Sequence, residues 1–414
     1  MTLLFQHAAQ LVGVTVPGEQ RKRGAAMRSL GVVEDGAVVV EGDRIAWVGP
    51  TRDLPPIAPD AESVDCTARV VLPAFVDSHT HLLFAGSRED EWEQRLLGRT
   101  YQQIAAAGGG ILSTVRRVRQ ASKEELKDLA RPRLQRLLHF GAGTVEVKSG
   151  YGLSAIDELK CLETIAELNA DGPLELVPTF LGAHAVPPEF RNDRDGYVRL
   201  LCDEMLPEVG RRGLAEFCDV FCETGVFSAA ESERILTRAR SLGLRLKLHA
   251  DELSPLGGAE LAARLGAASA DHLLCVSDAG IEALAASDVV ATLLPGTAFF
   301  LGADFAPARR LIDQGATVAL ASDCNPGTCP TENLPLLGAM ACARMAMTPA
   351  EVVHALTINA AAAVGRSDRV GSLAVGKQAD LAVFSVPDYR RLFYHFGINH
   401  VWRVYKRGRL VHAA

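Results

Sequence analysis

The sequence has no apolar stretch of about 18 residues, the length that a helix needs to cross a membrane. One uncharged stretch, residues 289–303, is interrupted by Pro295 and Gly296. The first ten residues also lack the basic segment and the apolar segment that mark a secretory signal. Nine cysteines are scattered along the chain, and an odd number without a signal is typical of reduced thiols. We therefore predict a cytoplasmic protein that does not enter a membrane.

Long basic runs are missing as well. The chain has 43 lysines and arginines against 50 aspartates and glutamates, a formal net charge of -7, and the two signs are interspersed. Nucleic acids and anionic membranes need clustered positive charge, so we predict neither as a partner. A small-molecule substrate with a negative charge fits this composition, because a single arginine can bind one carboxylate.

The middle of the chain alternates short apolar runs with amphipathic helical stretches. The runs are apolar throughout, as expected for parallel strands that are buried on both faces. The eight candidate strands are residues 72–77, 144–148, 176–181, 218–222, 244–248, 268–273, 289–294 and 318–322. Four of the preceding helices end in a glycine suited to the left-handed conformation that terminates a helix: Gly141, Gly243, Gly266 and Gly315. This repetition predicts an α/β fold, a (β/α)₈ barrel.

The two ends of the chain differ from the middle. Residues 37–48 and residues 401–411 each contain two β-branched runs separated by a turn with glycine, and residues 380–384 form a further short run. Such patterns predict hairpins. We expect the two ends to build one small β-sandwich. The predicted domains are residues 1–68 with 366–414 for the sandwich, and residues 69–365 for the barrel.

Chemistry in such a barrel takes place at the carboxyl ends of the strands. The first strand runs into His79 and His81, which share one face because they are two residues apart. His249 ends the fifth strand, and Asp323 ends the eighth. Each alone has a structural alternative, such as a buried hydrogen-bonded imidazole or a turn cap. Because one barrel geometry explains all four, together they predict a metal site.

Three histidines and one aspartate leave a coordination position for water, as in catalytic rather than structural metal sites. An ion in such a site lowers the pKa of bound water to about 7 and polarises a carbonyl group. Zinc is our first choice for the ion and iron(II) our second, and the ligand types alone do not separate the two.

Further titratable residues follow the strands at the same edge. His184 comes after the third strand and His272 ends the sixth, while Glu252 lies three residues beyond His249. Each could move protons or touch a ligand. The structural alternative is a histidine bonded to a neighbour, or a solvated carboxylate.

Two residues are candidates for binding a substrate directly. Arg88 follows the first strand and could bind a carboxylate, although an exposed arginine without a specific contact is the commoner case. Tyr151 follows the second strand and could hydrogen-bond a ligand or simply pack in its loop. The segment Gly108–Gly110 does not match a phosphate loop, and we interpret it as a mobile loop that could close over the barrel.

The motif His79-Thr80-His81 with His249 and Asp323 resembles the amidohydrolase superfamily in order and spacing. That superfamily has a (β/α)₈ barrel and a β-sandwich from both chain ends, and residues 371–381 resemble its return into the sandwich. Within it, the chain is similar to the enzymes that act on 4-imidazolone-5-propanoate. The matching segments are residues 79–89, 146–153, 180–188, 217–223, 249–265, 295–299, 323–332 and 394–400.

This resemblance implies hydrolysis of the cyclic amide of 4-imidazolone-5-propanoate to N-formimidoyl-L-glutamate, in histidine degradation, by a metal-activated water. It also suggests a homodimer. We expect one divalent ion, because the fourth strand has no lysine that could carry a bridging carbamate, and Lys148 lies on the second. The implied metal ligands are His79, His81, His249 and Asp323. The implied substrate-binding residues are Arg88, Tyr151, His184, Glu252, Asn325, Gly327 and Thr328.

Our hypothesis for the reaction places the ring carbonyl near the ion and the propanoate tail at Arg88. The attacking water gives a proton to Glu252, His184 or Asp323, and the same carboxylate or His272 returns one to the leaving nitrogen. The sequence leaves these assignments open. Two other functions also stay open: deamination of a heterocycle, which would release ammonia, and a metal-stabilised binding protein without turnover.

Overall fold

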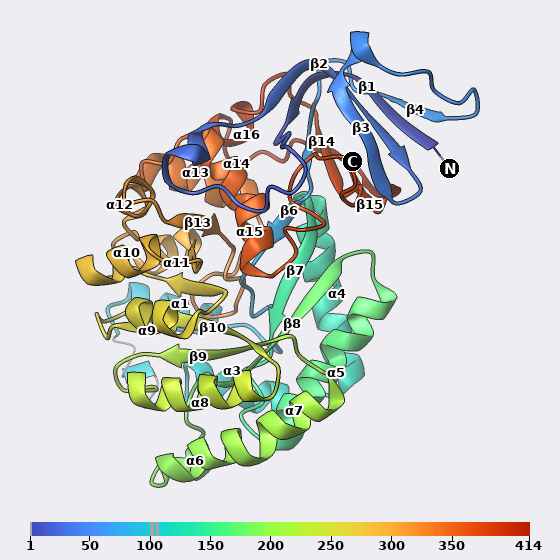
Figure 1. Cartoon of the computed structure of the whole chain (residues 1–414). Helices are drawn as coiled ribbons and strands as arrows, with labels where there is room; N and C mark the ends of the chain where they lie inside the picture. The colour runs from blue at the N-terminus through green and yellow to red at the C-terminus, as the bar shows by residue number, and fades with distance from the viewer. Residues whose placement is uncertain (1, 100–102, 105–106) are drawn as a thin grey trace.

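The computed structural model describes residues 2–99, 103–104 and 107–414. Eight parallel strands form a sheet in the order β13-β12-β11-β10-β9-β8-β7-β6, and helices cover its outer face (Figure 1). The strands are β6 Phe75–Asp77, β7 Ala142–Lys148, β8 Glu175–Ala183, β9 Phe217–Cys222, β10 Arg245–Ala250, β11 Ser269–His272, β12 Val290–Leu293 and β13 Thr317–Leu320. The predicted (β/α)₈ barrel is confirmed, with strand ends shifted by a few residues.

The barrel closes where its first and last strands end. Thr80 and Cys324 form a parallel bridge. The backbone N–H of Asp323 donates to the His79 carbonyl oxygen at 2.9 Å, and the N–H of His81 donates to the Cys324 carbonyl oxygen at 3.0 Å. Closure of the barrel therefore places three of the four predicted metal ligands side by side.

Helices connect the strands and begin at recognisable caps. Ser122, Ser228 and Thr348 each form a capping box with the glutamate three residues later, which satisfies free N–H groups in the first turn. The helices are α1 Glu89–Leu96, α3 Ile111–Gln120, α4 Lys123–His139, α5 Ala155–Asp171, α6 Arg194–Leu200, α7 Leu206–Arg212, α8 Ala229–Ser241, α9 Gly258–Leu265, α10 Asp278–Ala285, α11 Pro295–Leu301, α12 Ala308–Asp313, α13 Leu334–Arg344, α14 Pro349–Leu356, α15 Ile358–Ala363 and α16 Arg391–Tyr394. In the described ranges, none of them combines the length and apolarity needed to span a membrane.

The two ends of the chain share a second sheet, in which both termini lie (Figure 1). Its strand order is β16-β15-β14-β5-β1-β2-β3, with β4 paired to β1. These strands are β1 Thr2–Val12, β2 Val32–Glu41, β3 Arg44–Pro50, β4 Glu62–Asp65, β5 Val70–Pro73, β14 Leu381–Phe384, β15 Val401–Lys406 and β16 Arg409–Ala413. The predicted hairpins at both ends are confirmed.

This terminal sheet bends so that its two halves face each other. Strands β1 and β15 are three positions apart in the order, which is about 14 Å along a flat sheet. Yet the ring centroids of Phe5 on β1 and Tyr405 on β15 lie 4.8 Å apart, within one apolar cluster. The sheet therefore encloses its own core like a small sandwich.

One predicted strand is in fact two. Residues 72–77 were expected to form the first barrel strand, but β5 ends at Pro73 and pairs with β14 in the terminal sheet, and the barrel strand β6 begins at Phe75. Ala74 lies between them and donates its N–H to the Asp380 carbonyl oxygen at 2.9 Å. The run is apolar throughout because each half is buried in a different sheet. The predicted domain limits themselves stay a prediction.

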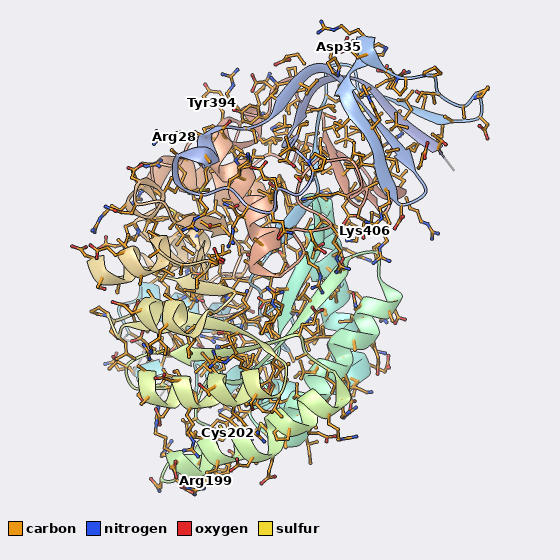
Figure 2. All side chains as sticks on the ribbon, viewed as in Figure 1. Arg28, Asp35, Arg199, Cys202, Tyr394 and Lys406 are labelled. Carbon is orange, nitrogen blue, oxygen red and sulfur yellow. The ribbon has the colours of Figure 1, made fainter. Side chains whose placement is uncertain are left out.

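Lys406 joins the two parts of the molecule (Figure 2). Its amine contacts Asp380 in the C-terminal region at 2.5 Å, and Thr144 and Glu175 on barrel strands at 3.3 and 3.4 Å. Because the side chain is buried and spans both parts, it fixes the terminal sheet against the base of the barrel.

Candidate active site

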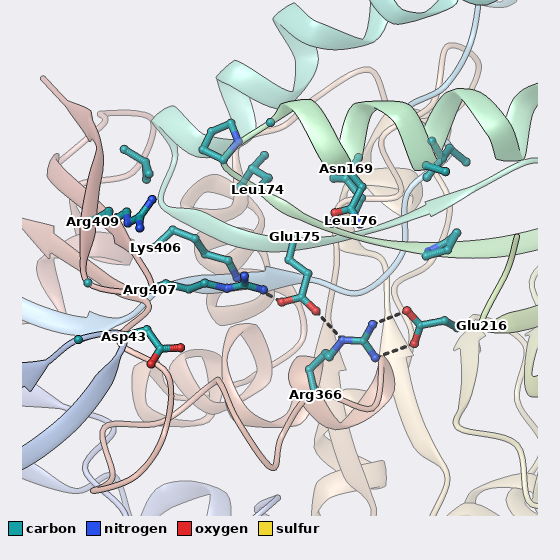
Figure 3. Close-up of a pocket in the computed structure, with 18 of the residues that line it drawn as sticks. Asp43, Asn169, Leu174, Glu175, Leu176, Glu216, Arg366, Lys406, Arg407 and Arg409 are labelled. Carbon is teal, nitrogen blue, oxygen red and sulfur yellow. Dashed lines mark hydrogen bonds and ion pairs between the residues drawn. The ribbon is translucent and has the colours of Figure 1, made fainter. Parts of the chain in front are cut away.

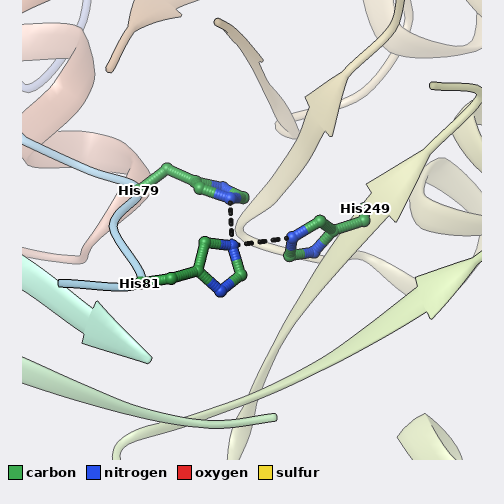
Figure 4. A group of neighbouring side chains, drawn as sticks. All are labelled: His79, His81 and His249. Carbon is green, nitrogen blue, oxygen red and sulfur yellow. Dashed lines mark hydrogen bonds between the residues drawn. The ribbon is translucent and has the colours of Figure 1, made fainter. Parts of the chain in front are cut away.

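The side chains of His79, His81, His249 and Asp323 converge at the carboxyl end of the barrel, and Figure 4 shows the three histidines. The Nε2 atom of His81 lies 3.3 Å from that of His79 and 3.2 Å from that of His249. The Oδ1 atom of Asp323 lies 3.4 Å from His81 Nε2 and 3.6 Å from His79 Nε2. Residues distant in the sequence thus direct four ligand atoms at one point.

The spacing of these atoms fits a metal ion. A zinc–nitrogen distance of about 2.0–2.1 Å and tetrahedral angles place neighbouring ligand atoms about 3.3 Å apart. All four residues are buried, and burial lowers the pKa of His79 and His81 well below the usual value. Neutral imidazoles are the form that binds metal. This histidine-rich group is therefore suited to hold a metal ion.

Two buried carboxylates orient the ligand rings. Asp271 lies 2.6 Å from Nδ1 of His79, and Asp219 lies 2.9 Å from Nδ1 of His249. Burial lowers the pKa of His249, but the Asp219 carboxylate outweighs this effect and raises it. Carboxylate partners of this kind fix the imidazole tautomer, so that Nε2 faces the ion.

A pair of buried lysines lies beneath these carboxylates. The amine of Lys148 is 2.8 Å from both Glu146 and Asp219, and the amine of Lys247 donates to the Ser78 carbonyl oxygen at 2.8 Å. Lys148 thus forms ion pairs with both carboxylates. The lysines compensate carboxylates that would otherwise be buried without a counter-charge.

The proton-transfer candidates lie on the same side of the barrel. Oε2 of Glu252 is 3.6 Å from Nε2 of His272. Burial raises the pKa of Glu252 to about 8, with a further contribution from Asp323. Burial also raises the pKa of Asp323 to about 6, although Thr297 opposes the shift by donating a hydrogen bond to Oδ2 at 2.6 Å. The two carboxyl groups therefore exchange protons at different pH.

His184 and Tyr151 stand beside the cluster. The His184 ring stacks on His81 at 4.9 Å, and the Tyr151 ring lies 5.3 Å from His184. Nδ1 of His184 lies 2.9 Å from the Gly150 carbonyl oxygen, so the proton belongs on Nδ1 and Nε2 carries the lone pair. Burial, with His249 nearby, lowers the pKa of His184 to about 3. His184 is thus a neutral acceptor towards the site.

Arg88 is held at the start of α1. Its Nε donates to Glu91 at 3.0 Å, so one edge of the guanidinium is occupied. Its terminal nitrogens lie against Gly327, where an added Cβ would meet them at 2.4 Å. Gly327 belongs to a turn in which the Asn325 side chain accepts from the N–H groups of Gly327 and Thr328, both at 2.8 Å. Asn325 is therefore committed to shaping the loop that faces Arg88.

The structure adds residues that the sequence interpretation did not assign to the site: Asp219, Asp271, Lys247 and Thr297. Asp271 directly precedes His272, and only the histidine received a role. Both side chains lie beside the His79 ring, because His272 adopts a positive φ of 80° that breaks the alternation of a strand, so the strand period could not have identified Asp271. Thr297 follows the seventh strand, and only the three-dimensional structure shows its contact with Asp323.

A cavity of about 1160 Å³ opens at the other end of the barrel strands (Figure 3). Four of its charged residues pair with one another: Arg366 binds both Glu175 and Glu216, and Lys406 also reaches Glu175. The predicted site residues do not line this cavity, which lies at the join between the barrel and the terminal sheet.

The barrel, the terminal sheet and the histidine-rich centre define a class of proteins, the amidohydrolases. The amidohydrolase family model matches residues 85–412. A second model, described as an imidazolonepropionase-like composite domain of bacteria, matches residues 36–61. Three solved structures share the fold: a triazine hydrolase variant (TM-score 0.73, 16% identity, covering 99% of this chain and 94% of that one), guanine deaminase of E. coli (0.73, 14%, 100% and 99%) and an adenosine deaminase of Xanthomonas campestris with bound zinc (0.70, 21%, 99% and 92%).

Sequence similarity narrows the class. The imidazolonepropionase of Geobacillus kaustophilus is 51% identical over 413 residues, which covers 99% of this chain and 97% of that one. The imidazolonepropionase of Porphyromonas gingivalis is 50% identical over 415 residues, which covers 100% and 98%. The chain therefore belongs to the imidazolonepropionase family of amidohydrolases, and the resemblance seen in the sequence is confirmed.

Proposed function

We propose that this enzyme hydrolyses 4-imidazolone-5-propanoate to N-formimidoyl-L-glutamate in histidine degradation. Water adds to the ring carbonyl carbon, the bond from that carbon to the ring nitrogen breaks, and the nitrogen takes up a proton. The carbonyl carbon becomes the new carboxylate of the product. The observation that carries the proposal is the convergence of His79, His81, His249 and Asp323 in a chain half identical to imidazolonepropionases over its whole length.

One divalent ion is held by these four residues, zinc as the first choice and iron(II) as the second. When bound, such an ion activates water and polarises the ring carbonyl. The ring partners Asp219 and Asp271 keep His249 and His79 in the tautomer that the ion needs.

The substrate lies between the ion and the loops at the barrel mouth. Arg88 binds the propanoate carboxylate with its terminal nitrogens, which can lie against the turn because Gly327 has no side chain. Tyr151 and His184 contact the ring from the opposite side. Asn325 and Thr328 shape the loop around Gly327 by hydrogen bonding to each other, and the loop brings both of them to the substrate.

The order of two raised pKa values supports an assignment of the proton transfers. Asp323, with a pKa of about 6, is ionised near neutral pH and takes a proton from the attacking water. Glu252, with a pKa of about 8, retains its proton and gives it to the leaving ring nitrogen. His272, 3.6 Å from Glu252, exchanges that proton with it, and His184 accepts a hydrogen bond from the ring.

The proposal includes a cytoplasmic location and a homodimer. Its test combines metal analysis with turnover. Chain purified without metal is expected to be inactive towards 4-imidazolone-5-propanoate and to recover on addition of one equivalent of Zn²⁺ or Fe²⁺. Product should form without ammonia. Full activity in metal-free chain would contradict the proposed centre, and ammonia release would indicate a deaminase.

A further inference from the structure

The loop that carries Tyr151 lies between strand β7 and helix α5. Two of its residues adopt positive φ angles, 98° at Gly150 and 51° at Leu153. The second of these is unfavourable for a residue with a side chain and persists only where the surroundings impose it. The loop nevertheless places the Tyr151 ring, which is almost fully buried, next to His81 and His184.

Glu158, in the first turn of α5, binds the N–H groups of this loop. Its Oε1 accepts from Gly152 at 2.7 Å, from Leu153 at 2.9 Å and from Gly150 at 3.1 Å. Glu158 is 1% exposed, and its described partners there are all donors. A carboxylate that only accepts hydrogen bonds matches such a set, and bonds of this kind are stronger than neutral ones.

The carbonyl groups of the same loop are bound by cationic or donor side chains. Arg119 on α3 donates from Nε to the Gly152 oxygen at 2.7 Å and from Nη2 to the Leu153 oxygen at 3.1 Å. The Nδ1–H group of His184 donates a hydrogen bond to the Gly150 carbonyl oxygen. Residues 150–153 are therefore held by opposite charges on two helices, and the same contacts set which His184 nitrogen faces the site.

We infer that Glu158 and Arg119 are positioning residues for the substrate: they fix the loop that presents Tyr151 and orients His184, without touching the metal ligands. This inference rests on the proposed function, because it gives Tyr151 and His184 their substrate roles. It predicts that loosening the loop weakens substrate binding and leaves metal binding intact. A displacement of about 1 Å in such a group is enough to cost about 100-fold.

The test compares Glu158→Gln with Glu351→Gln. Glu351 is equally buried, caps α14 and binds Arg28 and Arg309, so its change controls for loss of a buried carboxylate. We expect Glu158→Gln to raise KM for 4-imidazolone-5-propanoate about 10- to 100-fold. Zinc affinity, measured by chelator competition, should change less than twofold. Glu351→Gln should leave both values unchanged.

A double-mutant cycle identifies the route of the effect. If Glu158 acts through Tyr151, then Glu158→Gln should raise KM much less in a Tyr151→Phe background than in the natural chain. Hydrogen exchange of the Gly150, Gly152 and Leu153 amides should be faster in the Glu158→Gln single variant than in the natural chain. Additive KM effects, or unchanged exchange, would overturn the inference.

Arg119→Met keeps the test decisive if Glu158→Gln does not fold. It should raise KM in the same way, since it releases the two carbonyl groups; an unchanged KM would overturn the inference. A natural chain without turnover would instead overturn the proposed function, and the exchange rates would still decide whether these side chains hold the loop.

Discussion

The two ends of the barrel both bury many charges but treat them differently. At the base, Arg366, Glu175 and Lys406 form ion pairs that join the barrel to the terminal sheet. At the mouth, both ring nitrogens of His272 and Nδ1 of His81 are buried without a hydrogen-bond partner in the described part of the chain. Unpaired buried polar atoms cost free energy, so these imidazole nitrogens are suited to bind a ligand, although such atoms also occur at Arg403 and His412 in the terminal sheet. The two ends therefore differ chiefly in their ion pairs, which at the base join the two parts of the molecule.

The largest effect is expected from Asp323→Asn. It removes a charged ligand and the group that takes the proton from water, so kcat should fall at least about 100-fold while the fold survives. Metal content and circular dichroism should be measured beside turnover. Near-normal turnover would mean that the mouth does not use its carboxylate as we propose.

The second prediction concerns pH. The kcat/KM value should rise with pH as Asp323 loses its proton and fall at higher pH as Glu252 loses its own, since the pKa values of the two groups without a bound ion are about 6 and about 8. A bound divalent cation favours both ionised forms, so both limbs lie at lower pH in the loaded enzyme. Glu252→Gln should abolish the alkaline limb and lower kcat about 100-fold. An alkaline limb that persists in this variant would assign the proton to another group.

Arg88→Met should act on binding rather than on chemistry. Loss of a charge-assisted hydrogen bond to the propanoate is worth about 1.5–3 kcal/mol, so KM should rise about 10- to 100-fold with little change in kcat. Arg99→Met, on the segment after α1, is the control because Arg99 contacts only Gln94 among the described residues. Equal KM values for the two variants would show that a residue other than Arg88 binds the propanoate carboxylate.

The smallest effect on catalysis is expected at the base. Arg366→Met breaks the pairs with Glu175 and Glu216 and should lower the free energy of unfolding by about 1–3 kcal/mol. Turnover per folded molecule should stay unchanged, as measured by denaturant unfolding and steady-state kinetics. A fall in kcat would show that the ion pairs at the base also contribute to catalysis.

The convergence of the four proposed metal ligands could be predicted from the sequence, because each strand of a barrel leaves a local pattern in the chain. Each ligand directly follows or ends an apolar run, and the parallel order of the strands then brings His79, His249 and Asp323 to one edge. The division of residues 72–77 between two sheets could not be predicted, because both halves are buried and the apolar pattern is the same.

The contacts that support the site could not be predicted from the sequence either. Glu158 and Arg119 lie on different helices, and their shared role depends on how α3 and α5 pack around one loop. Likewise, Thr297 reaches Asp323 only because the chain turns sharply after β12. Such side chains carry no local pattern, since what they bind is set by tertiary packing.

The bridge between Thr80 and Cys324 is the seam at which the barrel shuts, and the ligands His79, His81 and Asp323 flank it. A chain that misaligns its first and last strands therefore forms neither a complete wall nor a complete coordination sphere. Binding of the proposed metal ion therefore requires a closed barrel, since only closure brings these side chains together.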